Sequence, residues 1–432
     1  MKIPPVKGTR DFYPSEMARR NWIIDGWKQA SLRSGFEEYD GPIFEHLRMY
    51  QIKSGDEIVE QLFSLQDRGG RDLAIRPEIT PTLARMVNQR INALPRPIKW
   101  FSVPRLCRAE RPQKGRLREF FQWNIDIIGQ DGAQADAEIV FATLDYLRMI
   151  GLTSKDVRAR ISSRRLLAAA LTSFGLPAES LEPLYALLDK KPKLPAETFE
   201  ALLAEQVPDA GQVRKILDFM AIDSIERVEE MAGANDEVLD AARELKQVFA
   251  MLGWMEVGEY CCFDPSIVRG LAYYTGIVFE VHDVAGELRA ICGGGRYDNL
   301  LRDFGGPTIS ATGMGMGDAV LEILLQEKGL LDRQVPKREL EYFVACAEQN
   351  AVFSKEMYRL TAAIRSRGHS ANLTYRFGGL SKQLKEAAGQ NAKKCVIFGQ
   401  EYIDKRELVV KDMTIGEQEL VDAEKFLSQL GS

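Results

Sequence analysis

Apolar and polar residues alternate strictly from Phe121 to Ile127, and this is the clearest pattern in the chain. The residues of the two sets are Phe121, Trp123, Ile125 and Ile127 on one side, and Arg118, Gln122, Asn124 and Asp126 on the other. Because successive side chains of a strand point to opposite faces, the apolar set can pack into a core while the polar set faces a cavity. The pattern therefore predicts a strand that forms the floor of a polar-ligand site.

A charged loop precedes this strand, over residues 110–116 (Glu-Arg-Pro-Gln-Lys-Gly-Arg). An earlier strand, from about residue 100, would complete a hairpin. The cations of the loop could bind a polyanion. When the segment is taken alone, an ordinary hairpin with a solvated charged tip explains the same residues.

Apolar spacing elsewhere predicts a mixture of helices and strands up to about residue 330. The expected elements are helices over 15–33 (with Ser15 as N-cap), 77–88 and 318–328, an extended segment over 36–45, and hairpins over 63–76 and 277–292. Residues 137–252 have a helical texture, rich in Ala, Leu, Glu and Lys. This order indicates one sheet that is interrupted by a helical insertion at about 160–250.

The last quarter of the chain follows another order. Residues 331–338 are polar and contain a proline, which is typical of a linker. From 339 to 432, strand-like and helix-like segments alternate, which predicts a small α/β domain with a mainly parallel sheet. We therefore expect two domains, 1–330 and 339–432.

Composition and charge narrow the classes of protein. The 432 residues are 45% hydrophobic, enough for two or three domains with large cores. The formal net charge is -5, so a nucleic-acid partner would have to meet a local basic patch such as 105–118. Six cysteines without a C-x-x-C pair and three widely separated histidines give no disulfide or metal pattern. No run of 18 apolar residues and no signal peptide is visible, so we expect a cytoplasmic protein without a membrane partner.

Four further segments carry side chains suited to a binding site: 76–80 (RPEIT), 269–276 (RGLAYYTG), 293–298 (GGGRYD) and 313–318 (GMGMGD). Glu78 and Thr80 could together orient an ammonium group, although Thr80 could equally be a helix N-cap. Arg269 could stabilise phosphate charge, and the two tyrosines after it could contact a buried polar ligand. Paired tyrosines also occur as ordinary core aromatics.

The glycines of the last two segments could also belong to a binding site. The three glycines at 293–295 let a backbone or a flat ligand approach closely, or they form a flexible turn. The alternate glycines at 313–317 leave one face of a strand without side chains, which can form a slot for a planar ring. This second segment does not fit the dinucleotide-binding fingerprint.

Taken together and in this order, the segments resemble class II aminoacyl-tRNA synthetases, and specifically the histidyl-tRNA synthetase family, over almost the whole chain. The matching segments are KGTRD at 7–11, Gly41-Pro42 at the place of the first class motif, 108–126 as the second class motif, RGLAYYTG and GGGRYDNL as the histidine-specific signatures, and QLKEAA and ELVVKDMTIGEQELV in the C-terminal domain. The resemblance implies an α/β protein with an α+β catalytic domain: an antiparallel sheet flanked by helices with a helical insertion, followed by a small α/β anticodon-binding domain. It also implies a homodimer.

The resemblance further implies a histidine–tRNA ligase, which activates histidine with ATP to histidyl-adenylate and transfers it to the 3'-terminal ribose of tRNA(His). The residues implied to bind histidine are Glu78, Thr80 and Gln122 at the α-amino group, Asp126 and Tyr274 at the imidazole nitrogens, and Tyr273 beside them. A site that hydrogen-bonds both ring nitrogens leaves buried groups unpaired with any other amino acid, and so discriminates strongly.

The same resemblance assigns the ATP and tRNA contacts. Arg108 would bind the α-phosphate, Glu110 and Arg116 would hold the nucleotide, and Arg269 would stabilise charge as the histidine carboxylate attacks. Mg²⁺ would offset phosphate charge, and no side-chain nucleophile is needed, so Arg108 and Arg269 are the implied catalytic residues. The implied tRNA contacts are Arg111 and Gln113 at the acceptor end, and Lys382, Gln383 and Lys385 at the anticodon.

Three positions depart from the family pattern. Val320 occupies the place of an arginine that reaches the ATP γ-phosphate, so that work would pass to another cation such as Arg296 or Arg116. Ala272 stands where aspartate is common, and Ile79 where glycine is usual. These changes motivate an alternative: a non-catalytic regulatory subunit of ATP phosphoribosyltransferase, which binds histidine without charging tRNA. Such relatives generally lack the C-terminal domain that this chain has.

Overall fold

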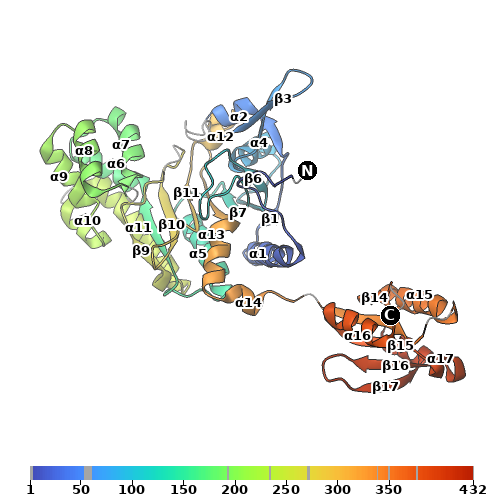
Figure 1. Cartoon of the computed structure of the whole chain (residues 1–432). Helices are drawn as coiled ribbons and strands as arrows, with labels where there is room; N and C mark the ends of the chain where they lie inside the picture. The colour runs from blue at the N-terminus through green and yellow to red at the C-terminus, as the bar shows by residue number, and fades with distance from the viewer. Residues whose placement is uncertain are drawn as a thin grey trace. The chain divides into compact units, whose positions relative to one another are not determined.

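The computed structural model describes residues 3–52, 61–191, 194–232, 235–269, 273–337, 339–348, 351–375 and 378–431. The chain divides into two compact units, residues 1–335 and 336–432 (Figure 1). Within the described residues, no helix is long and apolar enough to cross a membrane.

In the described part of the first unit, nine strands form one sheet. Their order is β1 (Glu37–Glu38), β5 (Ile98–Ser102), β7 (Glu119–Ile128), β12 (Ala311–Gly317), β11 (Cys292–Arg296), β10 (Ile277–Asp283), β8 (Val157–Ser163) and β9 (Cys261–Phe263), with β6 (Arg105–Cys107) paired to β7. All pairings from β5 to β8 are antiparallel, whereas β1 and β9 join the two edges in parallel. The expected antiparallel sheet is confirmed, and it brings strands from distant parts of the sequence side by side.

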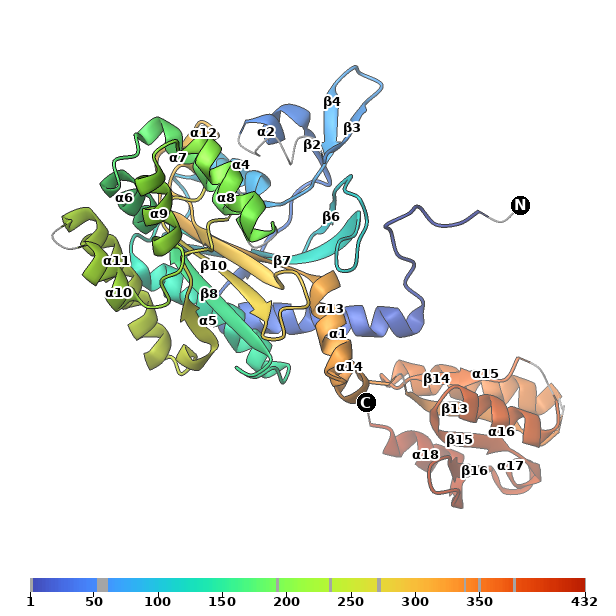
Figure 2. The same ribbon diagram turned by 60° about the vertical axis from the view of Figure 1, so that its left-hand side comes forward.

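Helices cover the apolar face of this sheet. α1 (Pro14–Arg33) and α5 (Ala133–Met149) pack against β7 and against each other (Figure 2), and α11 (Asp236–Trp254) packs against α5 and β8. Trp123 of β7 stacks on Trp27 of α1 with ring centroids 6.4 Å apart, and its ring centroid lies 5.4 Å from that of Tyr146 in α5. Trp123 and Ile125 are fully buried, so the predicted inward face of this strand is confirmed.

Shorter elements surround the other side of the sheet. They are α4 (Thr80–Arg90), α12 (Leu300–Asp303), α2 (Leu47–Gln51) and a small sheet in the order β2 (Phe44–His46), β4 (Asp72–Ile75) and β3 (Phe63–Gln66). α4 and α12 pack together, burying Leu83, Val87 and Leu301. After β12 the chain continues into α13 (Asp318–Glu327) and α14 (Leu330–Gln334), which contact each other.

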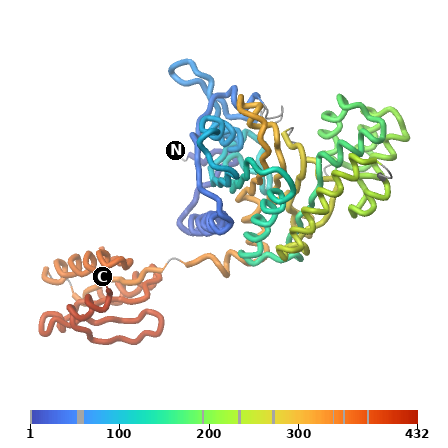
Figure 3. The backbone as a smooth tube through the Cα atoms, turned by 180° about the vertical axis from the view of Figure 1, so that it is seen from behind, coloured from blue at the N-terminus to red at the C-terminus, as the bar shows by residue number. Residues whose placement is uncertain are grey.

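The helical insertion forms a lobe beside the sheet (Figure 3). Its elements are α6 (Arg164–Ser173), α7 (Leu181–Leu188), α8 (Ala196–Gln206), α9 (Ala210–Phe219), α10 (Ile225–Ala232) and part of α11, with 3₁₀ turns η1 (Ala178–Ser180) and η3 (Gly258–Tyr260). The continuous helical texture expected over 137–252 is wrong at 157–163, which form β8. Val157, Ala159 and Ile161 are fully buried there, a two-residue period that the Ala- and Leu-rich surroundings obscured.

Three local predictions differ from the structure. α1 begins at Pro14 with Tyr13 at the N-cap, and the Ser15 hydroxyl bonds Glu16 instead of capping the helix. The second strand of the hairpin expected over 277–292 starts only at Cys292. It is β11, and it includes the three glycines at 293–295, which therefore do not form a turn. The linker expected at 331–338 overlaps α14, so its first four residues are helical.

The second unit, described by itself, is a five-stranded sheet with helices. In chain order its elements are β13 (Leu340–Cys346), α15 (Ala351–Ser366), β14 (Ala371–Leu373), α16 (Leu380–Gly389), β15 (Ala392–Phe398), α17 (Gln400–Lys405), β16 (Glu407–Asp412), β17 (Gln418–Asp422) and α18 (Ala423–Gln429). β14, β13 and β15 are parallel, and β16 and β17 extend the sheet in antiparallel fashion. The α/β prediction is confirmed, with a mixed rather than mainly parallel sheet.

Gln383 of α16 is buried and hydrogen-bonds to the backbone, which the sequence did not predict. Its amide oxygen accepts from the Cys346 backbone N–H at 3.0 Å, and its amide nitrogen donates to the Cys346 carbonyl at 2.9 Å. The side chain is 1% exposed, so it fastens α16 to the end of β13. The expectation that Gln383 meets an anticodon is therefore wrong, whereas Lys382 and Lys385 are not buried.

Candidate active site

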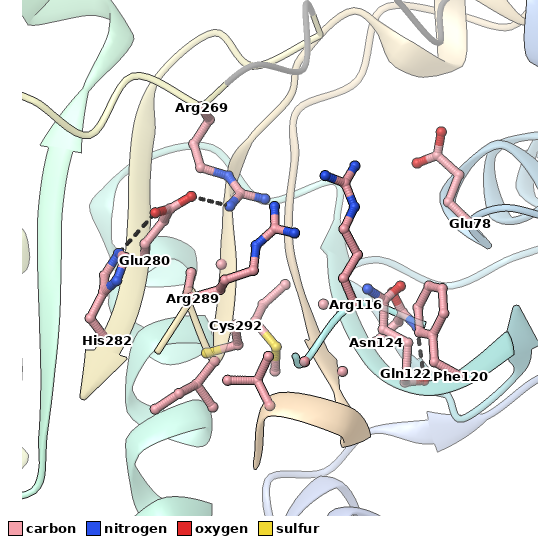
Figure 4. A pocket seen from close by; sticks show the side chains of 18 of the residues that line it. Glu78, Arg116, Phe120, Gln122, Asn124, Arg269, Glu280, His282, Arg289 and Cys292 are labelled. Atoms are coloured by element: carbon pink, nitrogen blue, oxygen red, sulfur yellow. Dashed lines mark hydrogen bonds and ion pairs between the residues drawn. The ribbon is translucent and has the colours of Figure 1, made fainter. Parts of the chain in front are cut away.

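A cavity of about 840 Å³ lies over the polar face of the first unit's sheet (Figure 4). β7, β10, β11 and β12 supply its walls, together with the loop after β6 and the segment before α4. Of the residues that the resemblance implied to contact histidine, ATP or the acceptor end of tRNA, all line it except Arg111: they are Glu78, Thr80, Arg108, Glu110, Gln113, Arg116, Gln122, Asp126, Arg269, Tyr273 and Tyr274. Arg111 is exposed on the loop outside the cavity.

The glycines of β12 make room for the polar side chains of β7. Gly313 pairs with Asp126 and Gly315 with Asn124 across the two strands. A methyl group at Gly313 would collide with the Asp126 carboxylate, and one at Gly315 would lie 2.9 Å from the Gln122 amide nitrogen. The predicted bare face of this strand is therefore confirmed, but β7 side chains occupy part of the space.

The glycines of β11 likewise make room for neighbouring groups. A methyl at Gly294 would collide with the backbone of Gly313, and one at Gly293 would collide with the Arg269 guanidinium. The triple glycine thus allows β11 to approach β12 closely and allows Arg269 to lie across the strand.

Asp126 forms the buried floor of the cavity. It is 3% exposed and accepts a hydrogen bond from the Tyr297 hydroxyl. Burial raises the pKa of Asp126 to about 7, although the Tyr297 hydrogen bond opposes this shift. Its second oxygen, Oδ2, has no hydrogen-bond partner within the described residues. Because buried polar atoms are almost always paired, this oxygen marks the place where a ligand donor fits.

Three tyrosines line the cavity together with this carboxyl group. The ring centroids of Tyr273 and Tyr274 lie 4.9 Å apart, and the ring of Tyr297 meets Tyr273 edge to face at 5.8 Å. Burial raises the pKa of Tyr273 and of Tyr297 well above the usual tyrosine value, so both hydroxyls stay protonated. The floor therefore presents hydrogen-bonding groups on rigid aromatic side chains, which suits a small planar polar ligand.

Glu78 and Thr80 lie at the start of α4. Glu78 is 5% exposed and lines the cavity. The N-cap position of α4 belongs to Ile79, and no side chain caps this helix, so the N-cap interpretation of Thr80 is wrong. The Thr80 side chain faces the cavity together with the Glu78 carboxylate.

Ion pairs hold the arginines around the mouth of the cavity. Arg116 pairs with Glu110, which is 8% exposed. Arg269 donates from Nη1 to Glu280 at 2.5 Å, and the other Glu280 oxygen lies 2.9 Å from Nε2 of His282. Although burial opposes it, Arg269 and His282 lower the pKa of Glu280 to about 2.

Arg108 is anchored differently. Its Nε donates to the Pro77 carbonyl at 3.0 Å, and its guanidinium lies 5.2 Å from the centre of the Phe120 ring. The side chain is thereby positioned between the segment before α4 and β7, where it lines the cavity.

Sequence reasoning missed several residues of the cavity. They are Arg160, Glu280, His282, Arg289 and Tyr297. Tyr297 belonged to a segment that stood out in the sequence but was assigned no role, whereas Asn124 was expected on the cavity face of its strand and lines the cavity. Glu280 and His282 share one face of β10 at the two-residue spacing of a strand, a signal that could have identified them.

Arg296 does not belong to the cavity. Its guanidinium is buried and donates to the Asp136 carboxylate at 2.8 and 3.0 Å, and to the carbonyls of Gln130 and Gly132. The expectation that Arg296 replaces a missing phosphate-binding arginine is therefore wrong, because this side chain is fully engaged in holding α5 to β11.

Comparison with known proteins agrees with this geometry. Residues 8–318 match the family model of histidyl-tRNA synthetase, and residues 341–432 match that of an anticodon binding domain. The chain belongs to the histidyl-tRNA synthetase family.

Individual relatives cover the chain from end to end. It is 38% identical to the chloroplastic/mitochondrial histidine–tRNA ligase of Arabidopsis thaliana, across 96% of this chain and 84% of that one. It is also 38% identical to the histidine–tRNA ligase of Opitutus terrae, across 95% and 93% of the two chains. The crystal structure of histidyl-tRNA synthetase from Nostoc sp. PCC 7120 has the same fold, with a TM-score of 0.81, 22% identity, and coverage of 100% of this chain and 99% of that one.

The departures from the histidyl-tRNA synthetase pattern have different structural settings. Ile79 is fully buried among the apolar residues of α4, including Leu83 and Val87, so its side chain contributes to the core. Val320 lies on α13 at the cavity wall, where a methyl at Gly115 would come within 2.9 Å of it. Ala272 lies outside the described residues.

Proposed function

We propose that the chain is a histidine–tRNA ligase, which forms histidyl-adenylate from histidine and ATP and transfers histidine to the 3'-terminal ribose of tRNA(His). The observation that carries this proposal is the buried Asp126, whose second oxygen lacks a partner in the described chain, on the floor of a cavity with several arginines at its mouth. Family membership and relatives named histidine–tRNA ligase support the same conclusion.

In this proposal, histidine lies on the floor with its imidazole at Asp126. Asp126 and Tyr274, with Tyr273 beside them, would hydrogen-bond the two imidazole nitrogens. Glu78, Thr80 and Gln122 would bind the α-ammonium group. A carboxyl group with a pKa of about 7 matches an imidazole, because the two groups can share a proton near neutral pH.

ATP would occupy the mouth of the cavity. Arg108 would bind the α-phosphate, with Glu110 and Arg116 holding the nucleotide. An oxygen of the histidine carboxylate attacks the α-phosphorus, and the bond to the β-phosphate oxygen breaks, releasing pyrophosphate. Arg269 stabilises the charge that develops, so positioning and electrostatics suffice without a side-chain nucleophile. Mg²⁺ would enter with ATP, since it is usually bound by substrate phosphates and one or two carboxylates.

The transfer of histidine to tRNA then requires that the tRNA bind to both the first and the second unit. A ribose hydroxyl of the terminal nucleotide attacks the histidyl carbonyl, and AMP leaves. Arg111 and Gln113 would meet the acceptor end, while residues 339–432 would bind the anticodon. The catalytic domain would then comprise residues 1–330, with the insertion at about 160–250. We further propose a homodimer in the cytoplasm.

The alternative of a regulatory subunit of ATP phosphoribosyltransferase rests on Val320, because an apolar side chain lines the cavity where the family pattern has a phosphate-binding arginine. Histidine-dependent ATP–pyrophosphate exchange on the purified chain separates the two functions, with the other amino acids as controls. Exchange with histidine alone is the expected result. Histidine binding without exchange would contradict the ligase and favour the regulatory subunit.

A further inference from the structure

Arg289 differs from the other cations of the cavity. Arg116 is paired with Glu110 and Arg269 with Glu280, while Arg160 lies 3.5 Å from Asp264. Arg289 also lines the cavity, but among the described residues it has neither a hydrogen-bond nor an ion-pair partner. It therefore brings a positive charge that no carboxylate of the described chain offsets.

The backbone around Arg289 is fixed on both sides. Before it, the N–H groups of Glu287 and Leu288 donate to the Asp283 carboxylate at 3.0 and 3.1 Å. After it, the Ile291 N–H donates to the Val281 carbonyl at 2.8 Å, and the Ile291 side chain is buried. The segment thus holds Arg289 at the cavity, where the residue is exposed.

The close-up shows where this side chain points. The guanidinium groups of Arg289, Arg269 and Arg116 are all turned into the cavity from different segments of the chain (Figure 4). An unpaired guanidinium with an accessible fork of N–H groups is suited to bidentate binding of phosphate oxygens.

The depth of the cavity indicates which phosphates Arg289 would meet. Histidine is expected on the buried floor at Asp126, so the α-phosphate must lie next to it. The β- and γ-phosphates then extend toward the exposed mouth, where Arg289 lies. Val320, which also lines the cavity, supplies no charge.

On the basis of the proposed function, we propose that Arg289 binds the pyrophosphate end of ATP and supplies the cation that position 320 lacks. It would stabilise the leaving pyrophosphate during adenylate formation and bind pyrophosphate in the reverse reaction. Arg289 is thus a phosphate-binding residue for the activation step, and histidine recognition does not depend on it.

ATP–pyrophosphate exchange without tRNA tests this assignment. In the Arg289→Ala variant, the KM values for ATP and for pyrophosphate should rise about ten- to a hundredfold, the loss expected for a charged hydrogen-bonding partner, while the KM for histidine stays unchanged. In Arg289→Lys, the KM values for ATP and pyrophosphate should lie between those of the unmodified chain and those of Arg289→Ala, because lysine keeps the charge but not the bidentate fork. Arg214→Ala is the matched control, since this arginine is 86% exposed on α9 and lies outside the cavity.

Three outcomes would count against the assignment or separate it from the proposed function. Unchanged KM values for ATP and pyrophosphate in Arg289→Ala would overturn it. Normal exchange with an increased KM for tRNA in aminoacylation would place Arg289 on a tRNA phosphate and also overturn it. If the unmodified chain shows no exchange, the ligase proposal fails. Calorimetric titration with magnesium pyrophosphate then still tests the anion site at Arg289. Weaker binding to Arg289→Ala than to the unmodified chain supports this site, and equal binding overturns it.

Discussion

The floor and the mouth of the cavity each contain a largely buried carboxyl group, and the two groups have different hydrogen-bond and ion-pair partners. At the floor, Asp126 meets a tyrosine hydroxyl instead of an ion pair within the described chain, and burial raises its pKa to about 7. At the mouth, Glu280 is also largely buried, but Arg269 and His282 hold its pKa near 2. One carboxyl group can therefore be neutral near neutral pH, whereas the other stays ionised.

This difference matches two kinds of ligand chemistry. A floor made of a titratable carboxyl group and tyrosine hydroxyls can distinguish a small ligand by its hydrogen-bonding pattern. A mouth of arginines pre-positioned by carboxylates is suited to phosphate charge, because the dipoles and charges need little reorganisation during the reaction. Substitutions at the two ends should therefore affect different kinetic constants.

The largest effect is expected at the mouth, from Arg269→Ala. This change removes the cation proposed to stabilise the charge that develops at the reacting phosphate, and it leaves Glu280 without its arginine partner. The rate of ATP–pyrophosphate exchange at saturating substrates should fall about a hundred- to a thousandfold, as for the loss of one transition-state hydrogen-bond donor.

Arg165→Ala is a suitable control for Arg269→Ala. It breaks another Arg–Glu pair, with Glu244 at 3.4 Å, outside the cavity. Its exchange rate should match that of the unmodified chain. A rate for Arg269→Ala within a few-fold of this control would show that the cation is not used in the reaction.

At the floor, Asp126→Asn should weaken histidine binding and leave ATP binding intact. The amide keeps the size of the side chain, but it has one acceptor oxygen where the carboxylate has two, and it cannot share a proton with the imidazole. The KM for histidine should rise about ten- to a hundredfold, with the KM for ATP unchanged. An equal rise in both constants would contradict the separation between floor and mouth.

The sequence predicts the floor of the cavity better than its mouth, because the floor depends on local sequence patterns and the mouth on contacts between distant residues. The floor was predictable because the alternation of Phe121 to Ile127 is local, and it places Gln122 and Asp126 on one face whatever the rest of the chain does. β8 was missed because the strands that pair with Val157–Ser163, β9 and β10, are both about a hundred residues or more away in the sequence.

The mouth was harder to predict because its charges are arranged by tertiary contacts. Arg296 and Arg289 lie in one short stretch of sequence, and nothing local distinguishes them. The structure buries Arg296 against Asp136 and leaves Arg289 facing the cavity. Which arginine is available for a ligand depends on α5, a helix that is distant in the sequence.

The raised pKa of Asp126 also predicts how stability depends on pH. Its folded-state pKa of about 7 lies above the value of 3.8 for an unperturbed group, so the folded state binds the proton more tightly. Stability due to this group is therefore lost as pH rises from about 4 to 7, and it changes little above that. Between pH 5 and 8, the unmodified chain should lose about 3 kcal/mol of unfolding free energy relative to Asp126→Asn.

Urea unfolding followed by tryptophan fluorescence measures this difference. All five tryptophans lie in the first unit, so the signal reports the unit that contains Asp126. Asp136, whose pKa burial raises to about 6 despite Arg296, is present in both proteins and cancels in the comparison. Parallel pH profiles for the two proteins would mean that Asp126 titrates normally.

The smallest effect is expected from adding a cation at the mouth, with Val320→Arg. In the unmodified chain the KM for ATP should change less than about threefold, because Arg289 already supplies charge there. In the Arg289→Ala background the same change should recover part of the lost affinity for ATP and pyrophosphate. Val320→Lys separates charge from geometry, since an ammonium lacks the bidentate fork. Equal effects of Val320→Arg in the two backgrounds would show that positions 289 and 320 act on different groups, because additivity is the behaviour of independent sites.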